Sequence, residues 1–297
     1  MRHLALGGMA AAALVFAHGA AAQDSGAPGD PEIVVTGNRD IETEISDFVG
    51  ALTPAPARGQ LGRFAWGVCP AAAGVAPGQK AAVVKRMRQI AKAAGIPLGD
   101  AKCIPNVQLI VSTDKKALIE ALQKRYPIYF GDLSGSAVRK LAREPGHAAA
   151  WHLNGAPLDA DGVPVPGLVG AVPVKRTSRM PSRIDPATQA HFAAAVVVVE
   201  SGALDGLTTT QLADYAAMRA FARIDASRIA EASAPTILKV LDAPMGSEVP
   251  ITITDWDMAF LRAFYDSNGG LYAAGQRSDI RKRLRKELEK GESRAEP

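Results

Sequence analysis

The residues most able to do chemistry in this chain are its histidines, of which there are five. Two lie within the first 22 residues, which leaves His147, His152 and His191 for a site in the body of the protein. His147 and His152 are five positions apart, so their rings would point to different faces of a helix and to opposite faces of a strand. The zinc motif H-E-x-x-H needs a spacing of four. We therefore predict no metal site and no cofactor.

Other catalytic motifs are missing or incomplete. The sequence contains no G-x-S-x-G, no Walker loop, no G-x-G-x-x-G and no cysteine near a histidine, so serine hydrolases, nucleotide-binding proteins and thiol proteases lack support. The segment Asp159-Ala160-Asp161-Gly162 opens like a calcium loop, but the later ligands are absent and it indicates a turn. One alternative stays open, a hydrolase with an unfamiliar site assembled from Glu200, His147, His152 and Asp257.

The two cysteines, Cys69 and Cys103, are 34 positions apart. In an oxidising compartment such a pair is more often a disulfide than a metal site or a reactive thiol. Closing a loop of this length would stabilise the fold by roughly 3 to 4 kcal/mol.

An oxidising compartment is indicated by the start of the chain. Arg2 precedes an apolar stretch, Leu4 to Phe16, which is too short to cross a bilayer, and Ala20-Ala21-Ala22 follows. These features predict a signal peptide over residues 1–22, cleaved before Gln23. We expect a periplasmic or secreted protein with no transmembrane segment after cleavage.

An acidic, Pro/Gly-rich stretch comes next, and we predict a disordered linker over residues 23–62. Between Asp24 and Asp47 it holds seven acids and one cation, Arg39. After Asp47 the chain carries 32 Lys and Arg against 23 Asp and Glu, a net charge of +9. A basic body could bind anionic envelope polymers or lipids, although the plainer interpretation is that the acidic arm is solvated or lies loosely over it.

The candidates for such binding are the cationic loop with Lys175, Arg176, Arg179 and Arg183, and the basic face from Arg277 to Lys286. Cations also form the polar face of the predicted helix Pro77–Gly95, at Lys80, Lys85, Arg86, Arg88 and Lys92. We expect no nucleic-acid partner, and the sequence does not indicate an oligomeric state.

The pattern of apolar residues predicts a single mixed α/β domain over residues 63–275 and a charged helix and tail over 276–297. The fold class is α+β, with a mixed sheet, packed helices and a disordered acidic arm in front. The expected helices are Pro77–Gly95, Lys115–Arg125 capped by Asp114, Ser136–Arg143, one capped by Thr209 or Thr210, Pro235–Leu241, Asp255–Tyr265 and Asp279–Lys290. The expected strands are Val107–Val111, Ile128–Phe130, a hairpin of Ala148–Asn154 with Val163–Val165, and Phe192–Val199, which should be buried on both faces.

The valine-rich strand His191–Glu200, the turn Leu204-Asp205-Gly206-Leu207 and the helix Gln211–Met218 together resemble a group of exported proteins of Gram-negative bacteria to which no activity is assigned. A strand that feeds a central helix is also distantly similar to zincin-type metallopeptidases. In those enzymes the central helix presents H-E-x-x-H. Here Gln211, Leu212 and Tyr215 occupy the corresponding helix, and they supply neither zinc ligands nor a base. The resemblance therefore implies a scaffold without the catalytic metal.

Near the amino terminus, Glu32-Ile33-Val34-Val35-Thr36-Gly37 resembles a TonB box. A β-branched segment in such an arm can add a strand to the sheet edge of an envelope protein partner. The chain is too short and too helical to be the 22-stranded receptor that normally carries this box. The alternative is a short apolar segment within a linker.

Taken together, these patterns predict an exported periplasmic protein that is not an enzyme and has a binding or accessory role in the cell envelope. The hydrolase above and a polyanion-binding module are the alternatives.

Overall fold

The computed structural model describes residues 37–159, 161–165, 168–169, 172–173, 177, 180–230, 232–244 and 246–295. The predicted signal peptide and residues 23–36 of the predicted arm lie outside these ranges. The described chain is α+β, with a mixed sheet and packed helices, as the sequence predicts. No helix in the described ranges is long and apolar enough to cross a bilayer.

The central strand of the sheet is β7, His191–Glu200. It runs parallel to β3 (Val107–Ser112), with Val107 opposite Ala195 and Ser112 opposite Glu200. On its other side it runs antiparallel to β4 (Ala148–Asn154). Its valines are buried on both faces, which confirms the prediction for this run. The remaining strands of this sheet are β1 (Arg63–Phe64) and β2 (Pro70–Ala73). A separate two-stranded ribbon is made of β5 (Leu168–Val169) and β6 (Val172–Pro173).

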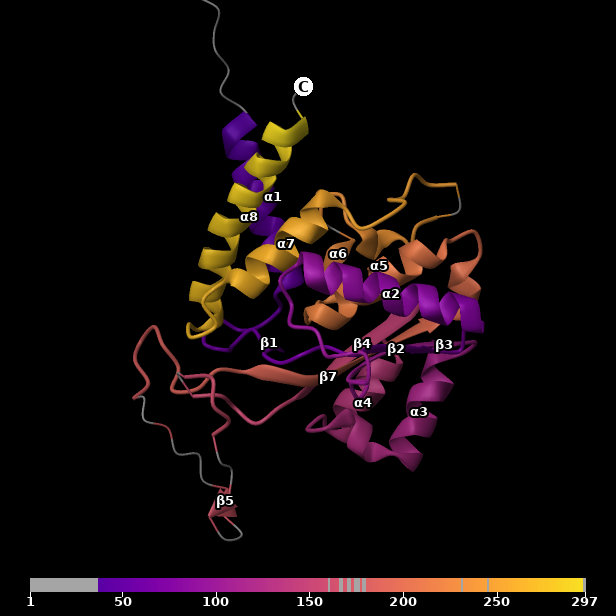
Figure 1. Cartoon of the computed structure of the whole chain (residues 1–297), viewed down its shortest axis with the longest axis horizontal. Coiled ribbons are helices and arrows are strands. Elements are labelled where there is room, and N and C mark those ends of the chain that lie inside the picture. Colours follow the sequence, from indigo (N-terminus) through magenta and orange to yellow (C-terminus); the bar gives the residue numbers. More distant parts are fainter. Residues whose placement is uncertain are drawn as a thin grey trace, which may run out of the picture.

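Helices cover both faces of this sheet, because alternate residues of β7 point to opposite sides. Val197 and Val199 belong to the larger core, whereas Val196 and Val198 belong to the smaller one. Figure 1 shows α2, α5 and α7 on one side of the sheet and α3 and α4 on the other. Their bounds are α2 Pro77–Ala93, α3 Lys115–Arg125, α4 Gly135–Ala142, α5 Thr209–Phe221 and α7 Asp255–Asp266.

The predicted linker over residues 23–62 is wrong for residues 37–52, because Gly37–Leu52 forms helix α1. One face of α1 buries Ile45, Phe48 and Leu52. The Phe48 ring meets that of Trp256 on α7 edge-on, with centroids 5.4 Å apart. The many acids of this segment made its helical repeat of apolar residues difficult to recognise in the sequence. Burial of the apolar face formed by this repeat holds the helix in place.

The charged carboxy-terminal helix is α8, Ala273–Ala295. Ile280 and Leu284 are buried and Leu288 packs beside them, as their four-residue spacing predicts. The helix begins before residue 276, the predicted boundary, and contacts both α1 and α7. Figure 1 shows α1 and α8 side by side.

Three local predictions are wrong. Ile128–Phe130 is not a strand but lies in the 3-10 helix Pro127–Phe130. The predicted hairpin does not form, since β4 pairs with β7 instead of with residues 163–165. The N-cap of α5 is Thr208, one residue before the expected threonines, and it forms a capping box with Gln211. The remaining short elements are the 3-10 helices Ser201–Leu204 and Ile237–Lys239, the latter within the predicted helix Pro235–Leu241, and α6, Ala226–Ile229.

Candidate functional site

The predicted disulfide is present, and it joins Cys69 to Cys103 with their Cα atoms 6.0 Å apart. It fixes residues 98–106, the disulfide loop, against the start of β2. Asn106 supports the same junction, because its Oδ1 accepts a 2.7 Å hydrogen bond from the Cys69 amide and its Nδ2 donates to the Gly67 carbonyl. From α2, Arg88 Nη2 donates to the Gly99 carbonyl at 2.7 Å. The loop is therefore held at several points along its length.

The structure separates the histidines. His147 is exposed at the carboxyl end of β7, with Nδ1 3.3 Å from Glu200 Oε2. His152 is buried, and its Nε2 lies 2.9 Å from the Ala220 carbonyl. Burial lowers the pKa of His152 to about 3, so this ring stays neutral. His191 packs edge-on against Trp66, with ring centroids 4.5 Å apart, and burial lowers its pKa too.

The four residues of the hydrolase alternative do not converge. His147 and Glu200 meet, and Glu200 also accepts a hydrogen bond from the Lys115 amide. Asp257 is fully buried elsewhere, where it binds Thr236 Oγ1 at 2.7 Å and joins the 3-10 helix Ile237–Lys239 to α7. Burial raises the pKa of Asp257, while these hydrogen bonds oppose that rise. In the described ranges, no group of three or more His, Cys, Asp or Glu side chains could hold a metal ion.

The segment Gln211–Met218 lies within α5, and the polar side chains of this helix hold the fold together. Gln211 caps the helix and donates to the Pro250 carbonyl. The Tyr215 hydroxyl accepts a 2.8 Å hydrogen bond from Arg219, and burial raises the pKa of this tyrosine. Asp214 binds Arg86 of α2. Each of these groups already has a partner within the protein.

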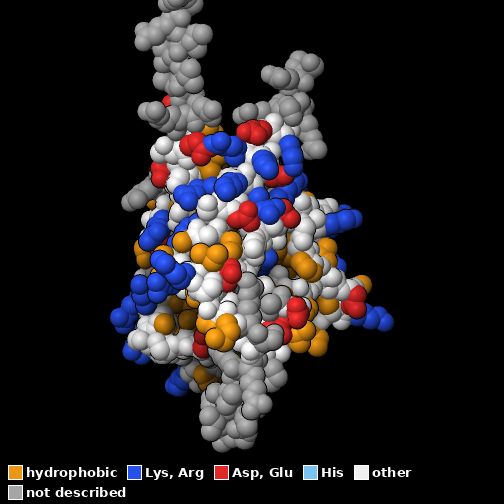
Figure 2. Space-filling model, turned by 90° about the vertical axis from the view of Figure 1, so that its left-hand side faces the viewer, with side chains coloured by type: hydrophobic (Ala, Val, Ile, Leu, Met, Phe, Trp, Pro, Cys, Tyr) orange, Lys and Arg blue, Asp and Glu red, His pale blue; other side chains and the backbone are white. Residues whose placement is uncertain are grey.

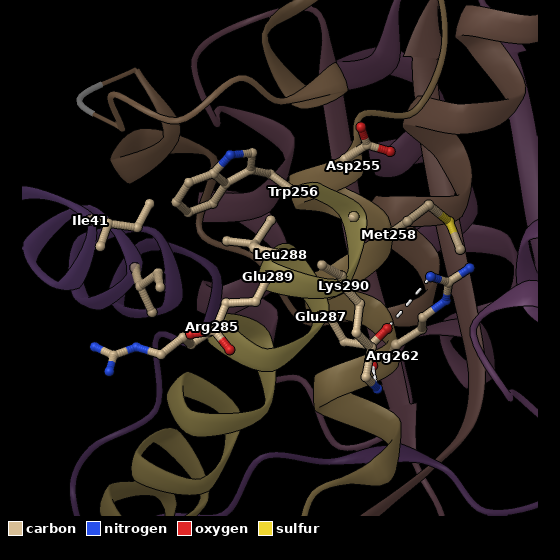
Figure 3. Close-up of a pocket in the computed structure, with 13 residues that line it drawn as sticks. Ile41, Asp255, Trp256, Met258, Arg262, Arg285, Glu287, Leu288, Glu289 and Lys290 are labelled. Atoms are coloured by element: carbon tan, nitrogen blue, oxygen red, sulfur yellow. Dashed lines mark hydrogen bonds and ion pairs between the residues drawn. The ribbon is translucent and has the colours of Figure 1, made fainter. Parts of the chain in front are cut away.

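A cleft of about 1170 Å³ lies between α1, α7 and α8. Figure 3 shows Ile41, Trp256 and Leu288, one from each helix, around the space between them. The cleft is large enough for a small ligand or for a side-chain cluster of a partner. Its apolar part was not visible from the sequence, because α1 was expected to be part of a linker.

The charges that line this cleft neutralise one another. Glu287 pairs with Arg262 at 3.6 Å and with Lys290 at 2.8 Å, as the dashed lines in Figure 3 mark. Arg285 pairs with Glu42. Figure 2 shows cations and acids mixed over α1 and α8 on this side of the molecule. The cleft therefore does not select a ligand by charge.

A groove of different chemistry runs along α2, beside the disulfide loop. Its volume is about 720 Å³, and its floor is formed by Pro77, Ala81, Val84 and Leu98. Four cations flank this floor, and no acid is among the described residues that line it. These cations, which with the floor define the basic groove, are Lys80, Lys85, Arg88 and Lys92. Since side chains four positions apart share a helix face, the sequence indicated this row.

The cations of the predicted loop and of the predicted carboxy-terminal helix do not form a comparable groove among the described residues. Lys175, Arg176 and Arg179 lie outside the described residues, and Arg183 is exposed. On α8, Arg277 donates to the Thr53 and Ala55 carbonyls, Arg281 to Ser46 and Arg283 to Asp266. Much of the basic face of α8 thus binds α1 and α7. Within the TonB-box-like segment, Glu32 to Thr36 lie outside the described residues, and Gly37 is the first residue of α1.

Comparison of the chain with protein-family models, with curated proteins and with solved structures finds no match in any of the three. The function is therefore argued from the residues of this chain.

Proposed function

We propose that this chain is an exported, non-catalytic binding protein of the bacterial cell envelope, and that the basic groove on α2 binds an anionic partner. Export is supported by the signal-like sequence of residues 1–22 and is compatible with the disulfide. The observation that carries the binding role is the concentration of four cations along an apolar floor with no acid among the described lining residues.

The groove differs from the cleft between α1, α7 and α8 because no acid among its described lining residues neutralises its cations. Lys80, Lys85 and Lys92 are exposed, so their ammonium groups can meet a ligand without losing a buried partner. Arg88 is the exception, because it also donates to the disulfide loop. A cluster of like charges raises the local concentration of anions and speeds their association, and salt screens both effects.

Charge reversal in the groove tests this role. The mature chain from Gln23 should be retained on heparin at low salt and released by about 0.5 M salt. The triple variant Lys80→Glu, Lys85→Glu, Lys92→Glu should lose retention. A matched variant, Lys116→Glu, Lys124→Glu, Lys140→Glu, makes the same charge change at exposed positions of α3 and α4, on the other side of the sheet.

The matched variant should keep most of the retention. Equal losses in the two variants would mean that net charge, and not the basic groove, determines binding. If the wild type is not retained on heparin at low salt, the proposed function is wrong. Circular dichroism of all three proteins should show the same helical content, because each substituted lysine is exposed.

A further inference from the structure

Next to the basic groove, the disulfide loop presents apolar side chains to solvent. Ile104, which follows Cys103 directly, is 88% exposed. Trp66 is 48% exposed and precedes Gly67, whose backbone packs closely against Gly99 of the loop. Single exposed apolar residues are common on protein surfaces. Here, however, Ile104 belongs to the same loop as Leu98, which forms part of the apolar floor of the groove.

The loop and the groove are physically continuous. Leu98 of the loop forms part of the groove floor, and Arg88 of the groove donates to the next carbonyl, that of Gly99. Lys102 adds a further exposed cation, whereas Asp100 is the loop's one carboxylate and accepts from the Lys102 amide. Five cations and one acid therefore surround a set of exposed or half-buried apolar side chains.

We propose that the basic groove and the disulfide loop together dock on the surface of an anionic phospholipid bilayer. This inference rests on the proposed function and names its partner. The lysines contact phosphate headgroups, and Ile104 enters the boundary between headgroups and acyl chains. A bilayer fits better than a soluble polyanion, because a polysaccharide offers nothing to bury the apolar side chains, whereas a bilayer takes both kinds of group.

The disulfide gives this face a fixed shape. Because Cys69 and Cys103 close the loop and Asn106 holds its end, Ile104 is already placed for insertion, and little ordering accompanies binding. Trp66 lies at the same junction, and tryptophan favours the interface between water and acyl chains.

Vesicle binding tests the inference. The mature chain is mixed with vesicles of phosphatidylcholine alone or of phosphatidylcholine with about one third phosphatidylglycerol, and the bound fraction is measured by sedimentation. Wild type should bind the anionic vesicles and not the neutral ones. Ile104→Ser should lower the partition coefficient about tenfold, as loss of one buried isoleucine side chain implies, without changing retention on heparin.

A control for lost apolar surface is Ile128→Ser, because Ile128 is 78% exposed on the 3-10 helix Pro127–Phe130. This variant should bind vesicles like wild type. A second readout is Ile104→Trp, whose added fluorescence should shift to shorter wavelength with anionic vesicles and not with neutral ones.

The outcomes separate this inference from the proposed function. Heparin retention without vesicle binding overturns the bilayer as partner and leaves the anion-binding role standing. If Ile104→Ser binds anionic vesicles as well as the wild type does, the loop does not insert. An Ile104→Trp emission spectrum that does not shift with anionic vesicles leads to the same conclusion. Absence of binding to both heparin and anionic vesicles overturns both proposals.

Discussion

The carboxylate of Asp214 on α5 lies 2.6 Å from Nε of Arg86 on α2, and the same guanidinium donates a second hydrogen bond at 3.0 Å. Asp214 is completely buried, and it also accepts from the Thr252 hydroxyl and the Ile253 amide. One carboxylate therefore ties together α2, α5 and the segment that leads into α7. Hydrogen bonding to Asp214 raises the pKa of Arg86, so its guanidinium stays charged.

We expect Asp214→Ala to destabilise the protein by roughly 1 to 3 kcal/mol, because it removes the hydrogen bonds that the buried carboxylate accepts from the half-buried Arg86, the Thr252 hydroxyl and the half-buried Ile253 amide. Urea unfolding followed by circular dichroism measures this loss. Asp205→Ala is the matched control at an exposed position and should change stability by less than about 0.5 kcal/mol. Similar values for the two variants would show that the buried carboxylate does not hold the helices together.

Loss of the Cys69–Cys103 disulfide should lower the free energy of unfolding by roughly 3 to 4 kcal/mol, because the open chain regains the freedom of a 34-residue loop. The double variant Cys69→Ser, Cys103→Ser, or the wild type in a reducing agent, should show this shift in urea unfolding. The reducing agent should have no effect on the double variant. A sensitivity to it there would point to a cause other than this bond.

His152 should make stability depend on pH. Its pKa is about 3 in the folded protein and 6.5 as the ordinary value, because burial and the nearby Arg223 disfavour the charged ring. The unfolded chain therefore binds the additional proton between these values, so stability is full above pH 6.5 and falls as the pH drops. Between pH 6.5 and about 5 the loss from this residue should reach roughly 2 kcal/mol.

The variant His152→Gln isolates this effect, since glutamine does not titrate. Urea unfolding at several pH values should show a shallower dependence for this variant than for the wild type. His147→Gln is the control, because His147 is exposed at the end of β7. The assignment would be wrong if His147→Gln flattened the profile and His152→Gln did not.

Arg277 should contribute to stability by holding the end of α1. Its guanidinium donates to the Thr53 and Ala55 carbonyls, each at 2.9 Å. Arg277→Ala should therefore cost roughly 1 to 2 kcal/mol of stability. Lys282→Ala, at an exposed position of the same helix, should cost much less. Thermal unfolding of the two variants compares them, and an equal change would contradict a specific role for Arg277.

Several elements were predictable because their signals are local. The run of valines gave β7 without any knowledge of its neighbours, and Asp114 caps α3 as expected, accepting from the Ala117 amide at 2.8 Å. The two cysteines likewise form the expected bond. In each case the residue types within a few positions, or the chemistry of a pair, limit the possible outcomes.

Other features depend on contacts between distant segments. Helix α1 is held by Phe48 against Trp256, more than two hundred residues away, and the acids around Phe48 suggested a linker. The partner of β4 is β7 and not the segment that follows β4 in the chain. Strand pairing depends on which sheet edge is available to a strand, and the sequence of the strand itself does not indicate which edge that is.

By itself the sequence determined the α+β class, the buried central strand, the disulfide and the row of cations on α2. Only the tertiary structure decided which cations remain available for a ligand. Arg86 and Arg277 are bound by Asp214 and by carbonyls near the end of α1, whereas Lys80, Lys85 and Lys92 line an open groove. The physical reason is that a charge is free or neutralised according to the groups that folding brings beside it, and those groups come from distant parts of the chain.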